Sequence, residues 1–154
     1  MIGPVGAVPD ITLAFGEGRY RFFLPIKAEI EVERLCGDTP LGVLYDAFSA
    51  CVGVNQETGE AVYLEGGPAR RHHARHIIRI AAQYGGEAEI QGETVKVSSI
   101  DATRLVEQHV DGRPFDEVIP VAWSILQATL TGVRLKKKPE GDETPSMSAG
   151  TEEA

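Results

Sequence analysis

The chain has 154 residues and a formal net charge of −8, from 15 lysines and arginines against 23 aspartates and glutamates. Its hydrophobic fraction of 42% and charged fraction of 25% are typical of a soluble globular domain. The negative charge argues against a general nucleic-acid or membrane-surface binder, because both partners are anionic. Two cysteines, Cys36 and Cys51, are too few for a disulfide scaffold, and we expect both to be buried free thiols.

The two ends of the chain differ in composition from the middle. Residues 1–9 are rich in glycine and proline, which predicts a flexible N-terminus. They contain no lysine or arginine, so we do not expect a signal peptide there. Residues 136–154 begin with three lysines and continue with Pro, Gly, Ser, Thr and acidic residues, which predicts a disordered tail. No apolar run approaches the roughly 18 residues of a membrane helix. We therefore expect one cytoplasmic domain over residues 10–135.

Alternating apolar residues predict two hairpins. The pattern flanks Gly16-Glu17-Gly18 over residues 11–24, and it recurs more briefly around Gln91-Gly92-Glu93 within residues 87–98. Residues 53–67 are rich in turn-forming residues, and we expect mainly a loop there, with a short strand near Val62 and Leu64 as the alternative. The expected buried face of the first hairpin consists of Ile11, Leu13, Phe15, Tyr20, Phe22 and Leu24.

Helical periodicity between proline and glycine residues predicts about five helices. Pro120 predicts a kink or a new start near Ile119, because proline lacks an amide donor and clashes one turn back. The expected spans are 25–37, 40–52, 68–84, 100–112 and 114–133. Residues expected to face inward are Ile26, Ile30, Val32 and Leu35; Leu41, Leu44, Tyr45, Phe48, Cys51 and Val52; Ala74, Ile77, Ile78 and Ala81; Ala102, Leu105, Val106 and His109 or Val110; and Phe115, Val118, Ala122, Leu126, Thr129 and Val133.

These elements predict an α+β fold. An N-terminal β-hairpin packs on a small bundle of about five helices, with a second short hairpin and a disordered C-terminal tail.

Polar clusters offer little chemistry. Two histidines between Arg70 and Arg79, His72 and His76, lie one helical turn apart and can share a metal, but the neighbouring arginines repel a cation. This helix is then either a basic patch for an acidic partner or nucleic acid, or a solvated face. We expect the carboxylates of Glu29 and Glu33 to be solvated. The sequence thus predicts a non-enzymatic protein without cofactor or metal.

Both ends of the predicted domain resemble one family of phage tail proteins. The opening, DITLAFGEGRYRFFLPIKAEIEVERLCGDTPLGVL, is similar to that of the gene-transfer-agent family of tail assembly chaperones, which is also labelled a tail tube family. The closing segment, IDATRLVEQHVDGRPFDEVIPVAWSILQATLTGV, is similar to the paired closing helices of that family. Residues that fit the closing pattern are Ala102, Leu105, Val106, Val110, Arg113-Pro114 and Ile125-Leu126. About a dozen extra residues after Tyr84-Gly85-Gly86 depart from it.

The resemblance implies a tail assembly chaperone of a phage, prophage or gene transfer agent. Such a protein binds the long helical tape measure protein, and in some cases the tail tube protein, during tail assembly. We expect a largely apolar contact to which Trp123, Arg75 and Arg79 contribute, although the core is the other place for Trp123. The alternatives are a structural tail protein, of the tube or completion type, and a regulatory module that uses the basic helix from Arg70 to Arg79. Assembly into a homo-oligomer is also left open.

Overall fold

The computed structural model describes residues 9–132, so the expected flexible N-terminus and disordered tail fall almost wholly outside the described residues. Within that range the fold is α+β, as the sequence predicts, with five helices and two antiparallel sheets. In chain order the elements are β1 Ile11–Phe15, β2 Gly18–Phe22, α1 Ile26–Leu35, α2 Leu41–Ser49, β3 Val52–Val54, β4 Ala61–Tyr63, α3 Arg71–Gly85, β5 Glu87–Ile90, β6 Glu93–Lys96, α4 Ser99–His109 and α5 Phe115–Thr131.

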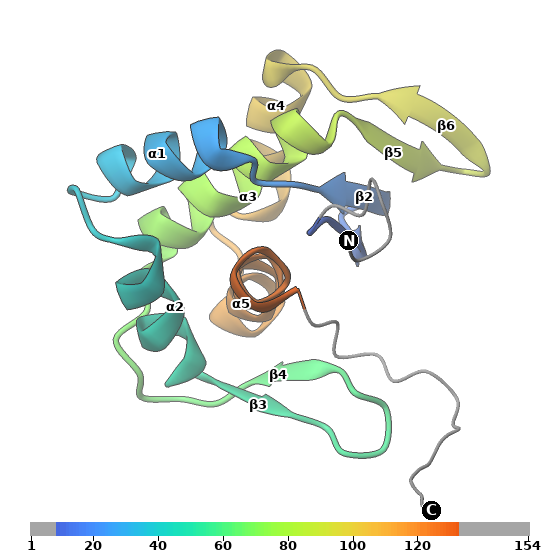
Figure 1. Cartoon of the computed structure of the whole chain (residues 1–154). Coiled ribbons are helices and arrows are strands. Elements are labelled where there is room, and N and C mark those ends of the chain that lie inside the picture. The colour runs from blue at the N-terminus through green and yellow to red at the C-terminus, as the bar shows by residue number, and fades with distance from the viewer. Residues whose placement is uncertain (1–8, 133–154) are drawn as a thin grey trace, which may run out of the picture.

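The two predicted hairpins are confirmed, and they join into one four-stranded sheet. The strand order is β1-β2-β5-β6, and every neighbouring pair is antiparallel (Figure 1). The seam between the hairpins is short, with Arg19 opposite Glu89 and Tyr20 opposite Ala88. Phe15, Phe22 and Leu24 are buried, so the predicted inward face of the first hairpin is correct.

Helix α3 crosses the middle of the fold and contacts α1, α4, α5 and β2 (Figure 1). Its predicted inward residues are all fully buried: Ala74, Ile77, Ile78 and Ala81. The helix begins at Arg71 and not at Pro68, because Arg70 has an extended backbone. It ends as predicted, with Gly86 at φ 76°, a left-handed conformation that glycine adopts without steric cost. The amide of Phe23 donates to the Ala81 carbonyl at 3.0 Å, which fastens the end of β2 to α3.

The predicted starts of α2 and α4 are close to those observed. Helix α4 has a capping box, in which the Ser98 hydroxyl accepts from the Asp101 amide and the Asp101 carboxylate accepts from the Ser98 amide. The bonds that the Ser98 amide and hydroxyl donate to the Asp101 carboxylate lower the pKa of Asp101. Both cysteines are buried free thiols, as expected, and burial raises the pKa of Cys36 to about 11. Val52, expected on the stripe of α2, instead begins β3.

The expectation of mainly a loop over residues 53–67 is wrong in part, because a second sheet overlaps it; the alternative of a short strand is confirmed at Val62, within β4, but not at Leu64. Strands β3 and β4 pair antiparallel, with Val52 opposite Tyr63. The ring of Tyr63 meets that of Phe115 edge-on at 6.0 Å, and β4 packs along α5. Strands of three residues give almost no alternating pattern, which is why the sequence does not predict this hairpin clearly. Packing against α5 stabilises it.

Helix α1 lies where predicted, and of its expected inward residues Val32 is buried and Leu35 packs against the core, but Ile26 and Ile30 do not. Ala28, Val32 and Cys36 are buried, whereas Ile26 and Ile30 are 69% and 60% exposed. The inward face is thus built from small and medium side chains at i, i+4 and i+8, which bring α1 close to α3. The two isoleucines were expected in the core and lie on the surface.

Helix α5 runs without interruption through Pro120, so of the two outcomes predicted near Ile119, a kink or a new start, the new start is wrong. The carbonyl that loses its donor belongs to Asp116, an exposed residue in the first turn, where access to solvent lowers the cost of the missing bond. Figure 1 shows α5 end-on in the middle of the other elements. It contacts α2, α3, β1, β3 and β4, and is therefore buried on more sides than one apolar stripe predicts.

Within residues 9–132, no helix combines the length and apolar character needed to cross a bilayer.

Candidate partner-binding surface

Trp123 lies in the core between α5 and α2. It is 6% exposed, its indole N–H donates to the Ser49 hydroxyl at 2.9 Å, and its ring stacks on Tyr45 at 6.3 Å between centroids. The Tyr45 hydroxyl in turn bonds the side chain of Gln127 on α5. Of the two places considered for Trp123, core and partner interface, the structure favours the core.

Two basic side chains of α3, Arg71 and Arg75, make contacts within the domain. Arg75 pairs with Asp111 through bonds of 2.8 and 3.2 Å, and this pairing raises the pKa of Arg75. Arg71 donates to the carbonyls of Val110 and Arg113 and lies over the ring of Phe115 at 4.9 Å. These contacts fasten α3 to the segment between α4 and α5. Two cations of the expected basic patch, Arg71 and Arg75, are therefore engaged in contacts within the domain. Arg79 is half-buried.

The three histidines of α3 are close together. The rings of His72 and His73 are 4.4 Å apart and those of His72 and His76 are 6.5 Å apart. Burial is the main cause that lowers the pKa of both His73 and His76, and the neighbouring cations add to it. Among the residues that the structure describes, no three histidine, cysteine or acidic side chains are placed to share a metal ion.

These lowered pKa values predict that mild acid destabilises the fold. As the pH falls below about 6.5, the ordinary pKa of histidine, His73 and His76 become protonated in the unfolded chain but stay neutral in the folded one. Their contribution to stability is complete above that pH and is lost as the pH falls toward the lower folded-state values. Replacing both with glutamine should flatten the fall in the free energy of unfolding between about pH 7.5 and pH 5.5, measured by urea denaturation. The parent and the variant share all carboxylates, so an equal fall in both would contradict the prediction.

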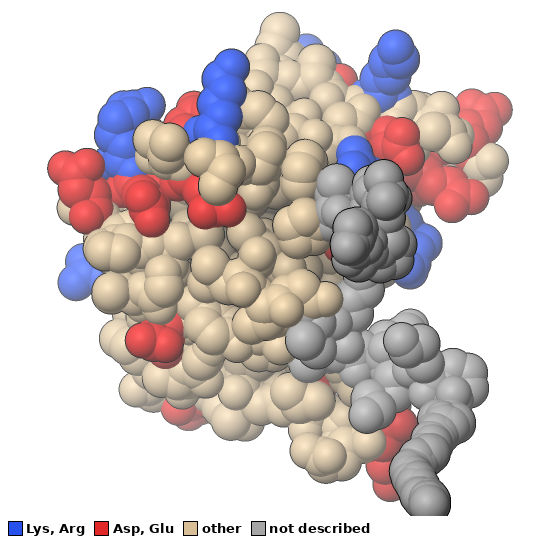
Figure 2. All heavy atoms as spheres, viewed as in Figure 1, with Lys and Arg blue, Asp and Glu red and all other residues tan. Residues whose placement is uncertain are grey.

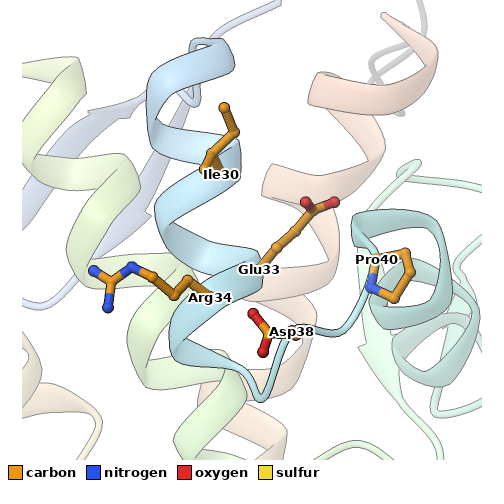
Figure 3. Close-up of a pocket in the computed structure, with 5 residues that line it drawn as sticks. All are labelled: Ile30, Glu33, Arg34, Asp38 and Pro40. Atoms are coloured by element: carbon orange, nitrogen blue, oxygen red, sulfur yellow. The ribbon is translucent and has the colours of Figure 1, made fainter.

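A more open surface lies where α1 meets α2. A depression of about 350 Å³ is lined by Ile30, Glu33, Arg34, Asp38 and Pro40 (Figure 3). Ile26 lies one turn before Ile30 on the same side of α1. We call this surface, formed by Ile26, Glu29, Ile30, Glu33, Arg34, Asp38 and Pro40, the α1–α2 face.

The turn between the two helices is held by specific bonds. Gly37 and Asp38 both have left-handed backbones, at φ 74° and 59°, which glycine and aspartate tolerate better than most residues. The Thr39 hydroxyl donates to the Cys36 carbonyl at 2.6 Å. The Leu41 amide donates to the Glu33 carboxylate at 2.7 Å, so Glu33 satisfies one of the free amides at the start of α2. The α1–α2 face is therefore shaped before any partner arrives.

The α1–α2 face is acidic as well as apolar. Glu29 and Glu33 are both half-buried, which corrects the expectation of a solvated pair. Burial, followed by the nearby Glu33 charge, raises the pKa of Glu29. Figure 3 shows Glu33 reaching toward α2, whereas Arg34 extends to the other side of α1. In Figure 2 acidic side chains gather along the lower edge of α1 and basic ones along its upper edge, beside a mainly uncharged surface that an acidic patch interrupts over α2.

Sequence reasoning missed this surface because it placed Ile26 and Ile30 in the core. The signal that was available is the spacing of Ala28, Val32 and Cys36, a stripe of small residues on the other side of the same helix. Comparisons with protein-family models, with curated proteins and with solved structures gave no match for this chain.

Proposed function

We propose that this protein is a non-enzymatic tail assembly chaperone of a phage, prophage or gene transfer agent. It acts in the bacterial cytoplasm, where it holds the tape measure protein until tail tube subunits assemble around it. The resemblance of residues 10–44 and 100–133 to that family suggests the role. The observation that carries it is the exposed pair Ile26 and Ile30, one turn apart beside an open depression.

Such a surface suits a helical partner. Apolar side chains one turn apart on one helix match the i, i+4 stripe of an amphipathic helix laid against it. Large exposed isoleucines lose water contact when a partner covers them, which favours association. The regulatory alternative is less well supported, because Arg71 and Arg75 are engaged within the chain.

The test is co-expression with a tape measure protein, which the proposal expects to be encoded in the same gene cluster. We expect the tape measure protein to become soluble and to co-purify, and the complex to survive moderate salt because its contact is largely apolar. A nucleic-acid complex would lose several decades of affinity over the same range. Retention of nucleic acid at low salt, with the tape measure protein insoluble, would refute the proposal. Mass spectrometry of purified particles decides the remaining alternative, since a chaperone is absent from them and a structural tail protein is present.

A further inference from the structure

We propose that the α1–α2 face docks an amphipathic α-helix that carries lysine or arginine beside its apolar stripe. The inference rests on the proposed function, in which a segment of the tape measure protein supplies this helix. It adds the place of contact and the chemistry of the partner, neither of which the resemblance specifies.

The apolar part of the site is a pair of isoleucines and the depression next to them. Ile26 and Ile30 are 69% and 60% exposed, more than most other large apolar residues of the described chain. Ile30 also lines the depression together with Pro40, so the apolar surface continues from α1 onto the start of α2. Two anchors and a neighbouring hollow fit the side chains of one turn of a partner helix.

The charge of the site selects the partner. Glu29, Glu33 and Asp38 place three carboxylates around the isoleucines, against one cation that also lines the depression, Arg34, whose side chain extends away from Glu33. Basic residues that flank the apolar stripe of a partner would meet these carboxylates. An anionic membrane or a nucleic acid would be repelled. A second copy is disfavoured too, because a twofold contact through this face would bring the same carboxylates of both copies together.

The surface is also prepared for binding. The Glu33–Leu41 bond of 2.7 Å and the Thr39–Cys36 bond of 2.6 Å hold the angle between α1 and α2. A partner then loses little binding free energy to ordering this part of the protein.

The first experiment uses the full chain and two synthetic helical peptides. Both have leucines at i, i+4 spacing; one has lysines along the flanks of this stripe and the other glutamates. We expect the lysine peptide to bind, followed by fluorescence anisotropy, and the glutamate peptide to bind at least about tenfold more weakly. Equal binding of both peptides, or no binding of the lysine peptide, would overturn the inference.

Substitutions on α1 locate the contact. Ile30→Ser should weaken binding of the lysine peptide about 30-fold, as loss of a central anchor does. The matched control is Ile100→Ser on α4, where the isoleucine is 63% exposed, and it should leave binding unchanged. Glu29→Lys should weaken the lysine peptide about fivefold and strengthen the glutamate peptide. Its control, Glu31→Lys, makes the same charge change about 160° round the helix from Glu29, on the opposite side of α1. Equal effects of target and control overturn the assignment.

Other occupants of the face give distinct results. If Ile30→Ser dissociates an oligomer in sedimentation and leaves peptide binding unchanged, the face belongs to a second copy and the inference fails. If the lysine peptide binds only after Lys136→Glu, Lys137→Glu and Lys138→Glu are combined, the chain's own C-terminal segment is the occupant and the inference also fails.

Failure of the inference can be told apart from failure of the proposed function. If the parent and the Ile26→Ser/Ile30→Ser variant solubilise the tape measure protein equally, the chaperone role stands and the docking site is wrong. If the lysine peptide binds at the α1–α2 face while the tape measure protein stays unbound, the docking site stands and the chaperone role is wrong.

Discussion

Replacing Gly85 with alanine should lower the free energy of unfolding by about 3 kcal/mol or more, at the upper end of the cost of inserting atoms into a packed core. A Cβ atom at this position would overlap the Arg21 carbonyl oxygen and lie 2.6 Å from the Arg21 carbonyl carbon and 3.2 Å from the Phe22 amide nitrogen. All three are backbone atoms of β2, which is held between β1 and β5. The strand therefore has to move away from α3, which also breaks the 2.9 Å bond from the Arg21 guanidinium to the Gly85 carbonyl.

Two other glycines provide controls. Gly42 lies in α2, and a Cβ atom added there would meet no atom within 4 Å, so Gly42→Ala should be neutral or stabilise by up to about 1 kcal/mol. Gly86 has a left-handed backbone and no close neighbour, so Gly86→Ala should cost only about 1–2 kcal/mol. Urea denaturation followed by circular dichroism measures all three. If Gly85→Ala is as stable as Gly42→Ala, the close approach of α3 to β2 is wrong.

Replacing Trp123 with alanine should cost about 3–5 kcal/mol, the usual range for removing a large aromatic side chain from a core. The indole ring fills the space between α5 and α2, stacks on Tyr45 and donates to Ser49. Alanine leaves a cavity there that the two helices cannot close without shifting, because the Tyr45–Gln127 bond also joins them. Calorimetry or urea denaturation of the variant gives the loss directly.

Smaller changes at the same site separate packing from hydrogen bonding. Ser49→Ala keeps the ring but leaves the buried indole N–H without its acceptor, which should cost about 1–3 kcal/mol. Trp123→Phe keeps an aromatic ring against Tyr45 and should cost less than Trp123→Ala. A Trp123→Ala variant with unchanged stability and lost partner binding would return Trp123 to the role of a surface anchor.

The elements with strong local signals could be predicted from the sequence alone. Alternation around Gly16-Glu17-Gly18 requires a hairpin with one buried face, because successive strand residues point to opposite sides. The stripe from Leu41 to Phe48 and the stripe of Ala102, Leu105 and Val106 likewise predict α2 and α4. In each case the residues that set the structure are neighbours in the chain, so their pattern is readable without knowing what they pack against.

The candidate site could not be predicted in this way. On α1, both Ile26 with Ile30 and Ala28 with Val32 have helical spacing, and hydrophobicity alone favours the isoleucines for the core. The close approach of α1 to α3 reverses that order, because small side chains let the helices meet and leave the larger ones outside. Glu33 is likewise an ordinary surface residue in the sequence, and becomes the cap of α2 only when the turn at Gly37 brings Leu41 to it.

Local sequence by itself thus determined most of the secondary structure, the α+β class and the inward faces of β1, β2, α2, α3 and α4, since these follow from the periods of the backbone. Tertiary structure decided the rest. It joined the hairpins through β2 and β5, stabilised β3 and β4 against α5, and surrounded α5 so that Trp123 is buried. The physical reason is the same throughout. Whether a side chain is buried depends on elements distant in the chain, and periodicity defines the faces of an element but not which face packs against another element.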